Sequence, residues 1–354
     1  MPESSHASVS ARPRIHIEGE DKPELERDLT RLEIVETVQG LYRCEAEFNN
    51  WGAEPDPDFL YFDRKLLDFG KLFAVELDDD LLFEGRIMGL EARFAPGQTP
   101  RLSALVEDRF QDLRMTRRTR TFAEVSDADV AQRIASDHGL TADVSADGPN
   151  YTVLAQVNQS DLAFLRERAR SIDAELWMGD SKLVMKTRDN RRASAIPLTL
   201  HSELESFTVL ADLATQRSSV AANGWDVKSK EALQFSADES AIQPELNGDE
   251  SGVSILKSKL GERKEALAHT VPLNSSETEA IARSYFKNCA RRFVVGHGTA
   301  RTRADLRVGA VVDLKKLGPL FSGKYYVVAV RHRFDLTEGL HTEFTAERAG
   351  LGRP

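Results

Sequence analysis

The sequence predicts a mainly β protein with an α+β insertion. Short runs in which apolar and polar residues alternate recur in the first and last thirds of the chain, as expected for strands with one buried face. Between them, two helical patterns alternate with strand patterns. A length of 354 residues is sufficient for two or three domains, each with its own core. With 41% hydrophobic and 29% charged residues, the chain has the composition of a folded protein.

The first β region is predicted over residues 12–110, after a disordered tail at residues 1–11. Turn-forming residues separate its strand patterns, and Asp78-Asp79-Asp80 is a natural hairpin connection. Short strands at this spacing favour an antiparallel barrel or sandwich. The expected strands are residues 29–35, 42–48, 71–77, 82–88 and 101–107.

An α+β module is predicted over residues 111–196. Ser126 is placed to cap a first helix that buries Val130 and Ile134 and stops at Gly139. A second helix begins at Ser160, whose hydroxyl can accept from the first-turn N–H groups. Two strands should follow at residues 175–178 and 182–185. The apolar stripe of the second helix consists of Leu162, Leu165, Ala169 and Ile172.

A second β region is predicted over residues 197–350. Residues 228–268 are polar with little periodicity and predict an exposed excursion. Ser276-Glu-Thr-Glu279 has the pattern of a capping box, so we expect a helix over residues 276–292. Four strand patterns then follow at residues 294–300, 306–314, 323–332 and 340–348.

Patterns typical of catalytic, cofactor and metal sites are missing from the sequence. It contains no zinc-binding His/Cys spacing, no P-loop, no dinucleotide fingerprint and no Gly-x-Ser-x-Gly elbow. The spacing of Asp78-Asp79-Asp80 is not that of a calcium loop. The two cysteines, Cys44 and Cys289, favour free thiols in a reducing compartment. No apolar run is long enough to span a membrane.

Charge is unevenly distributed along the chain, whose net charge is −10. Residues 1–110 carry 13 Lys/Arg against 24 Asp/Glu, whereas residues 291–333 carry ten Lys/Arg against two Asp. Solvated strand faces are one interpretation, and oppositely charged modules that meet between subunits are the other. A nucleic-acid site is disfavoured by the acidic chain and by the lack of interleaved aromatics. The candidate interface residues are Arg114, Arg117, Arg118, Arg120, Arg301, Arg303 and Arg307.

Three motifs resemble those of hub proteins in contractile phage tails and related injection systems. The run from Ser160 to Leu165, followed by Trp177, is similar to the helix-and-hairpin signature of these hubs. The segment 82–87, Leu-Phe-Glu-Gly-Arg-Ile, resembles the strand that ends their first barrel. Residues 323–332 with Thr342-Glu-Phe344 resemble the end of their second barrel. The family includes the phage late control protein D group and the hub part of type VI secretion VgrG spike proteins.

This resemblance implies two antiparallel β-barrels flanking the α+β module, and a homotrimer in which six barrels alternate around a ring. Such a ring would adapt a threefold spike to a sixfold tail tube. It would be made in the bacterial cytoplasm and have no catalytic residue and no cofactor. Its partners would be a separate spike protein, the first tail-tube ring, baseplate wedge proteins, and a tape measure or cargo in the channel. Neither a membrane nor a specific nucleic acid is expected as a partner.

Two other classes remain open from the sequence. One is a tail-associated cell-wall hydrolase, for which residues 228–268 are too short and polar to supply a fused enzyme. The other is a free-standing cell-wall or carbohydrate-binding β protein, which solution mass would distinguish from a trimeric hub. The sequence does not distinguish a phage from a bacteriocin or an effector-delivery particle.

Overall fold

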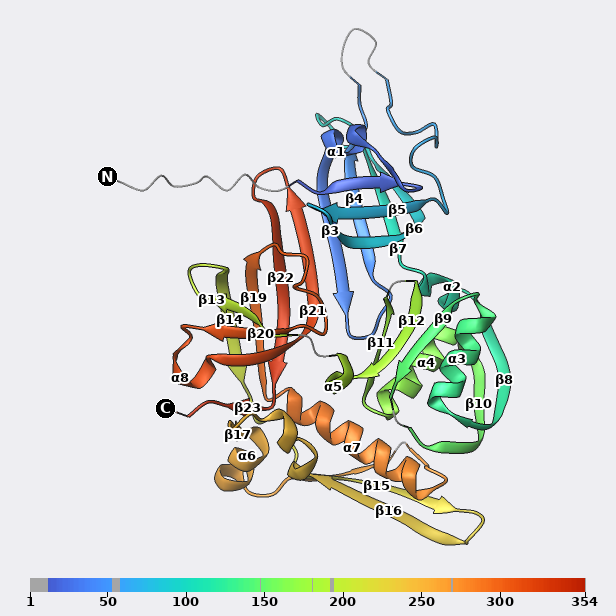
Figure 1. Ribbon diagram of the computed structural model, residues 1–354, viewed down its shortest axis with the longest axis vertical. Coiled ribbons are helices and arrows are strands. Elements are labelled where there is room, and N and C mark those ends of the chain that lie inside the picture. The colour runs from blue at the N-terminus through green and yellow to red at the C-terminus, as the bar shows by residue number, and fades with distance from the viewer. Residues whose placement is uncertain are drawn as a thin grey trace.

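The computed structural model describes residues 12–52, 58–146, 148–179, 181–191, 194–268 and 270–353. The tail expected at residues 1–11 lies outside this range. Figure 1 shows two β regions beside each other, which we call the first unit (residues 12–110) and the second unit (residues 196–211 and 294–351). The α+β module follows the first unit, and α7 and the β15–β16 hairpin lie along the bottom of the view, below the second unit and the module. The predicted mainly β fold with an α+β insertion is confirmed.

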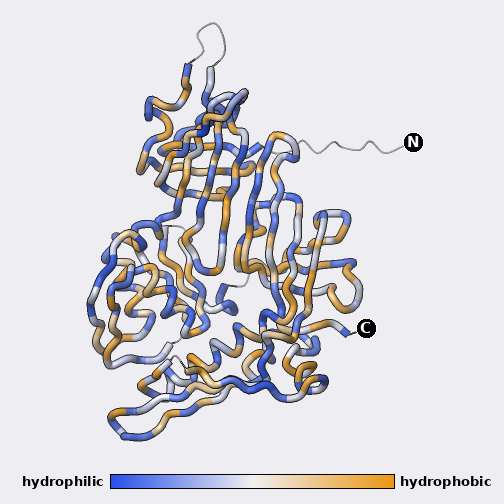
Figure 2. The backbone as a smooth tube through the Cα atoms, turned by 180° about the vertical axis from the view of Figure 1, so that it is seen from behind, coloured by the Kyte–Doolittle hydropathy of each residue, from blue (hydrophilic) through white to orange (hydrophobic). Residues whose placement is uncertain are grey.

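The first unit contains the strands expected from alternation, because their apolar faces form one hydrophobic cluster that includes Ile34, Phe48 and Phe73. Figure 2 shows this alternation of hydrophobic and hydrophilic residues along the strands. The elements are β1 (Arg14–Ile17), β2 (Glu20–Asp21), α1 (Pro23–Asp28), β3 (Leu29–Thr37), β4 (Arg43–Asn49), β5 (Leu72–Leu77), β6 (Asp80–Arg93) and β7 (Arg101–Glu107).

The α+β module has both predicted helices and caps. The Ser126 hydroxyl accepts from Asp129 N–H, and the Ser160 hydroxyl accepts from Ala163 N–H. The four residues of the predicted stripe, Leu162 to Ile172, are buried in a second cluster. Strands β8 and β9 were not predicted. The elements are α2 (Phe110–Arg114), β8 (Arg117–Ser126), α3 (Asp127–Asp137), β9 (Thr141–Ser145), β10 (Asn150–Ser160), α4 (Asp161–Ser171), β11 (Ala174–Gly179), β12 (Lys182–Thr187) and α5 (Arg188–Arg191).

The second unit buries a third cluster, which includes Val312, Tyr325 and Phe344. Its four C-terminal strand patterns are confirmed, although β20 begins five residues later than the pattern predicted. The elements are β13 (Ile196–Thr199), β14 (Leu204–Ala211), β19 (Val294–Arg301), β20 (Val311–Lys315), α8 (Gly318–Phe321), β21 (Gly323–Asp335), β22 (Gly339–Arg348) and β23 (Gly350–Leu351).

The prediction of an exposed excursion at residues 228–268 is wrong for residues 241–256, whereas most of the remaining residues of the segment are exposed. Ile242, Leu246 and Val253 are buried in a fourth cluster together with Phe286. These three spaced apolar residues are enough to anchor short elements, although they produce no regular period. The elements are β15 (Ser219–Asp226), β16 (Glu231–Asp238), η1 (Glu239–Ala241), η2 (Gln243–Glu245), β17 (Glu250–Ser251), α6 (Gly252–Leu260) and β18 (Lys264–Leu267).

Helix α7 (Ser275–Arg291) forms close to the predicted range, but its start differs from the prediction. The N-cap is Asn274, whose side chain accepts from Glu277 N–H at 2.8 Å, rather than Ser276. The sequence predicts that Ala280, Ile281, Ser284, Tyr285 and Cys289 lie near one face of this helix. Of these, Ser284 is buried, and the buried apolar residues are instead Ala282, Phe286 and Ala290.

The two units share one sheet, in the order β14-β19-β22-β21-β3-β4-β7-β6-β5-β1-β2, with β20 and β13 beside β21. The pairings in this sheet are antiparallel except that β13 runs parallel to β20. The junction of the units is therefore a strand pair, β3 with β21, and not only a contact between side chains.

Candidate assembly interface

Strand β21 belongs to both units. Along one edge it pairs with β22; along the other, its N-terminal part pairs with β20 and its C-terminal part with β3. The β3–β21 register runs from Ala329 opposite Thr37 to Asp335 opposite Arg31. A strand of thirteen residues is long enough to leave its own unit and to complete the sheet of the other.

The inward face of β21 passes from one hydrophobic core into the other. Val330 belongs to the core of the second unit, whereas Phe334, only 5% exposed, belongs to the core of the first. Between them lies the buried ring of His332, whose Nδ1 is 2.8 Å from Thr342 Oγ1. Burial lowers the pKa of His332 to about 3, with a smaller contribution from the positive charge of Arg307. From the sequence, His332, at the end of a strand pattern, is expected to be packed or hydrogen-bonded rather than a metal ligand, and the structure shows it both packed and hydrogen-bonded.

Ion pairs surround this junction. The carboxylate of Glu36, 1% exposed, accepts from Arg307 Nε–H and, at 3.2 Å, from Val308 N–H. On the outer face, Arg331 Nε lies 3.6 Å from Glu33 Oε1. Because Glu36 is buried and its partners come from the other unit, this contact fixes the position of one unit against the other.

The strand register of the first unit recurs in the second. Strand β6 pairs with β5 and β7 as β21 pairs with β20 and β22. In each long strand the register shifts at the same step, between Ile87 and Gly89 in β6 and between Val327 and Ala329 in β21. Such bulges bend a strand, so both long strands bend at the same place.

A second shift supports the same correspondence. The β3–β4 register shifts between Leu29 and Arg31, and the β14–β19 register shifts between Leu204 and Ser206. The five strands β3, β4, β5, β6 and β7 thus correspond in order to β14, β19, β20, β21 and β22. The chain is an internal duplication of one β unit.

The duplicated units differ in what covers their edges. Phe94 follows β6 where Phe334 lies in β21, but Phe94 is 63% exposed. Leu32 of β3 is fully buried beneath β21, whereas its counterpart Phe207 of β14 is only half-buried. Sequence reasoning missed these residues. The dipeptide Arg93-Phe94 recurs as Arg333-Phe334, but Arg-Phe also occurs at residues 109–110 and 292–293, so it was not a distinctive signal.

The predicted interface arginines of the module lie on α2 and β8. Arg114 pairs with Glu107, and Arg117 Nη1 donates to Asn158 O at 3.2 Å. Arg120 Nη1 donates to Asp137 at 2.6 Å.

Arg118 and Arg120 also meet at Asp161, the second residue of the Ser160–Leu165 motif. Arg118 Nε lies 3.2 Å and Arg120 Nη2 2.7 Å from the buried carboxylate of Asp161. Burial opposes the ionisation of Asp161, yet hydrogen bonds from His138 and Gln156 and the two guanidinium charges hold its pKa below its usual range. This network connects β8, α3, β10 and α4 within one chain.

The three C-terminal candidates are separated from the module arginines, and each has different surroundings. Arg301 is exposed at the end of β19, and Arg303 pairs with the exposed Asp305. Arg307 forms the contact with Glu36 at the junction of the units. Among the described residues, these three arginines share no acidic partner with the arginines of the module.

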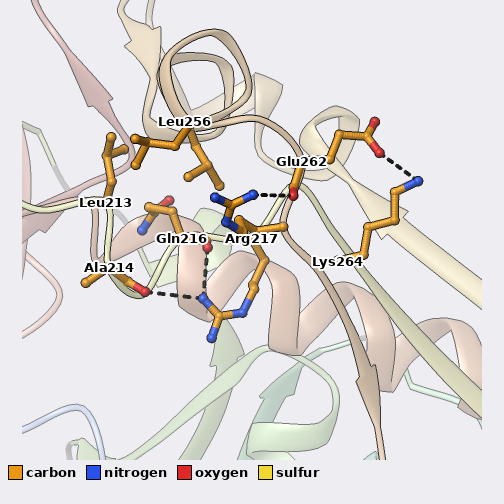
Figure 3. A pocket seen from close by; sticks show the side chains of 9 residues that line it. Leu213, Ala214, Gln216, Arg217, Leu256, Glu262 and Lys264 are labelled. Atoms are coloured by element: carbon orange, nitrogen blue, oxygen red, sulfur yellow. Dashed lines mark hydrogen bonds and ion pairs between the residues drawn. The ribbon is translucent and has the colours of Figure 1, made fainter.

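Other candidate sites are less developed. A pocket of about 530 Å³ is lined by residues of the loop before β15 and by α6, including Leu213, Arg217 and Leu256 (Figure 3). Arg217 in that pocket donates to main-chain oxygens of Ala214 and Gln216. Within the described ranges, no group of three or more His, Cys, Asp or Glu side chains could hold a metal ion. Cys44 and Cys289 are free thiols.

No helix of the described residues is both long and apolar enough to cross a membrane.

The chain has the fold of phage tail and type VI secretion proteins. It is similar to the 43 kDa tail protein of prophage MuSo2 from Shewanella oneidensis, with a TM-score of 0.70, 11% identity, and coverage of 96% of this chain and 99% of that chain. The tail protein from Neisseria meningitidis MC58 matches with a TM-score of 0.68, 13% identity, and coverage of 97% and 98%. An E. coli component of the type VI secretion system, described as similar to T4 bacteriophage tail proteins, matches with a TM-score of 0.60, 12% identity, and coverage of 96% and 79%.

Residues 70–336 match the model of the family described as the Alg8 N-terminal domain. The chain belongs to this family. No curated protein matches its sequence.

Proposed function

We propose that this protein is the structural hub of the baseplate of a contractile injection system or phage tail. It acts as a homotrimeric ring that connects a threefold spike to a sixfold tail tube. The observation that carries the proposal is the duplicated β unit, in which one copy of the strand-to-strand junction is formed within the chain and the edges for a second copy are open. The similarity to tail proteins over nearly the whole of each chain supports it.

The open edges lie on different units, which favours a closed ring over a twofold dimer. A chain that offers the edge of β6 and accepts with the edge of β14 forms a head-to-tail contact, and such contacts generate a ring when the rotation closes. Three chains with two similar units each would place six units around the axis. This geometry resolves the mismatch between threefold and sixfold partners.

The function of the ring would be mechanical rather than enzymatic. Its expected partners are a separate spike protein, the first tail-tube ring and baseplate wedge proteins, with a tape measure or cargo in the channel. The chain would be made in the bacterial cytoplasm and incorporated into the particle. The α+β module and the α7 segment, which project from the joined sheet in Figure 1, are the natural contacts for baseplate components.

Solution mass tests the proposal. Sedimentation velocity of the purified chain, alone and with a spike protein from the same particle, should give a species of three times the chain mass of 39.5 kDa in at least one of the two samples. A monomer in both samples at micromolar concentration would contradict the trimeric hub. It would favour the alternative of a cell-wall-binding protein.

A further inference from the structure

Two long strand edges of this molecule are open, although their counterparts in the duplicated unit are paired. Among the residues that the structure describes, strand β14 ends the sheet order, and the C-terminal half of β6 pairs only with β7. The corresponding edges of β3 and β21 are paired with each other. Exposed edge strands readily pair with other chains, and proteins usually protect them with charges, prolines or covering segments.

We propose that β14 of one chain pairs antiparallel with the C-terminal half of β6 in a second copy, with Arg93 opposite Thr208 and Phe94 opposite Phe207. This inference rests on the proposed ring and adds the strands and the residue register that hold it closed.

The register follows from the junction within the chain. There, Arg333 lies opposite Glu33 and Phe334 opposite Leu32. The bulge in each long strand equates Arg333 with Arg93, and Phe334 with Phe94. The shift in each first strand equates Glu33 with Thr208 and Leu32 with Phe207. Applying the β3–β21 pairing to β14 and β6 therefore gives one register without further choice.

The burial of residues along β6 also supports pairing of this edge with a second copy of the chain. Leu90 packs against the core of its own unit, as Val330 does in β21. Two and four residues further on, Ala92 and Phe94 are exposed, whereas their counterparts His332 and Phe334 are covered by the other unit. Phe94 is thus an aromatic side chain aimed beyond its own core, and a neighbouring second unit would bury it.

On the β14 side, the residues equivalent to buried residues of β3 are likewise less buried. Leu32 and Ile34 of β3, which pairs with β21, are fully buried. Their counterparts Phe207 and Val209 pack against the third cluster but stay half-buried. Pairing with β6 would cover both residues and place Phe94 against Phe207, a cross-strand aromatic pair.

Disulfide cross-linking of the full chain tests the register. Directly opposed residues of antiparallel strands lie within the Cα separation that a disulfide accepts. In a Cys289→Ser background, we expect Arg93→Cys with Thr208→Cys to give covalently linked dimers and trimers on oxidation. The matched control, Arg93→Cys with Val209→Cys, is one residue out of register and should give neither. The pair Arg333→Cys with Glu33→Cys should give a cross-link within the monomer, because it repeats the pairing inside one chain.

The outcomes separate this inference from the proposed function. Covalent dimers and trimers that form only in the proposed register support it. A protein that sediments as a trimer but forms no such link, or links equally out of register, overturns the inference while the hub proposal stands. A chain that remains monomeric with and without its spike contradicts both.

A second variant probes the aromatic contact without cysteines. Phe94→Ala should raise the dissociation constant of the trimer about tenfold or more, because buried aromatics dominate such contacts. The control is Phe69→Ala, since Phe69 is also an exposed aromatic of the first unit but is not part of the proposed pairing. Equal dissociation of the two variants would overturn the contact assigned to Phe94.

Discussion

The first and second units have the same strand register, but only one of their two equivalent junctions is formed inside the chain. At the β3–β21 junction, Phe334 and His332 are buried between two cores. At β6 and β14 the corresponding positions are exposed or half-buried. The difference shows that two copies of one fold can use the same strand edges differently. The same contact is then intramolecular in one copy and available to another chain in the second.

The largest expected contrast is between two phenylalanines at equivalent positions. Phe334→Ala should lower the free energy of unfolding of the monomer by about 3–5 kcal/mol, because it leaves a cavity in the first core. Phe94→Ala should change the free energy of unfolding by less than about 1 kcal/mol, because it removes ring contacts with Phe59 and Phe62 rather than a core side chain. Urea unfolding at a concentration below trimer formation measures both. Similar losses would show that Phe94 is part of the monomer core and would refute the comparison.

A smaller effect is expected at the ion pair that joins the units. Arg307→Ala leaves the buried carboxylate of Glu36 with Val308 N–H as its remaining described donor. The monomer should be destabilised by about 2 kcal/mol, discounted from a fully buried pair because Arg307 is partly exposed.

Arg303→Ala is the matched control for Arg307→Ala, since both arginines are partly exposed but Asp305, the partner of Arg303, is exposed whereas Glu36 is buried. It should cost about 0–1 kcal/mol. Equal unfolding midpoints for the two variants would contradict a structural role of Glu36 at the junction.

The junction should also make the monomer acid-sensitive. The pKa of His332 is lowered to about 3 in the folded chain from an ordinary value of 6.5, because the ring is buried. Below pH 6.5, His332 binds a proton in the unfolded chain but not in the folded chain. Stability should therefore fall by up to about 1.4 kcal/mol per pH unit as the pH drops from 6.5 toward 3.

His332→Gln removes the titrating group and should reduce the loss of stability between pH 7.5 and pH 5 by about 2 kcal/mol. His297→Gln is the control, because His297 is exposed on β19 and its ring contacts Thr345. An unchanged pH dependence in His332→Gln would mean that the ring becomes protonated without opening the junction.

Much of the local structure could be predicted from sequence, because single faces of strands and helices dictate it. Alternation located the five main strands of the first unit, and the 3.6-residue period located the stripe of α4. The same reasoning misplaced part of the buried face of α7, where Ala282 and Phe286 are buried instead of Tyr285. A helix packed on more than one side has no single apolar stripe, so its period is ambiguous.

Long-range pairing could not be read from the sequence. Nothing in residues 29–37 or 323–335 taken separately says that β3 pairs with β21, because pairing depends on both units being folded. The duplication is equally hidden, since register shifts leave no compositional signal and Arg-Phe is the main identity shared by the long strands. The charge asymmetry predicts contacts between subunits, which the structure of a single chain does not test; within the chain, Arg307 pairs with Glu36 and Arg331 with Glu33.

Electron cryomicroscopy of the assembled ring tests the central claim most directly. We predict six β units around the axis from three chains, with each sheet continuing from β14 of one chain into β6 of the next and Phe94 buried beside Phe207. A ring in which those two strands face solvent or the channel, or an assembly without threefold symmetry, would contradict the account.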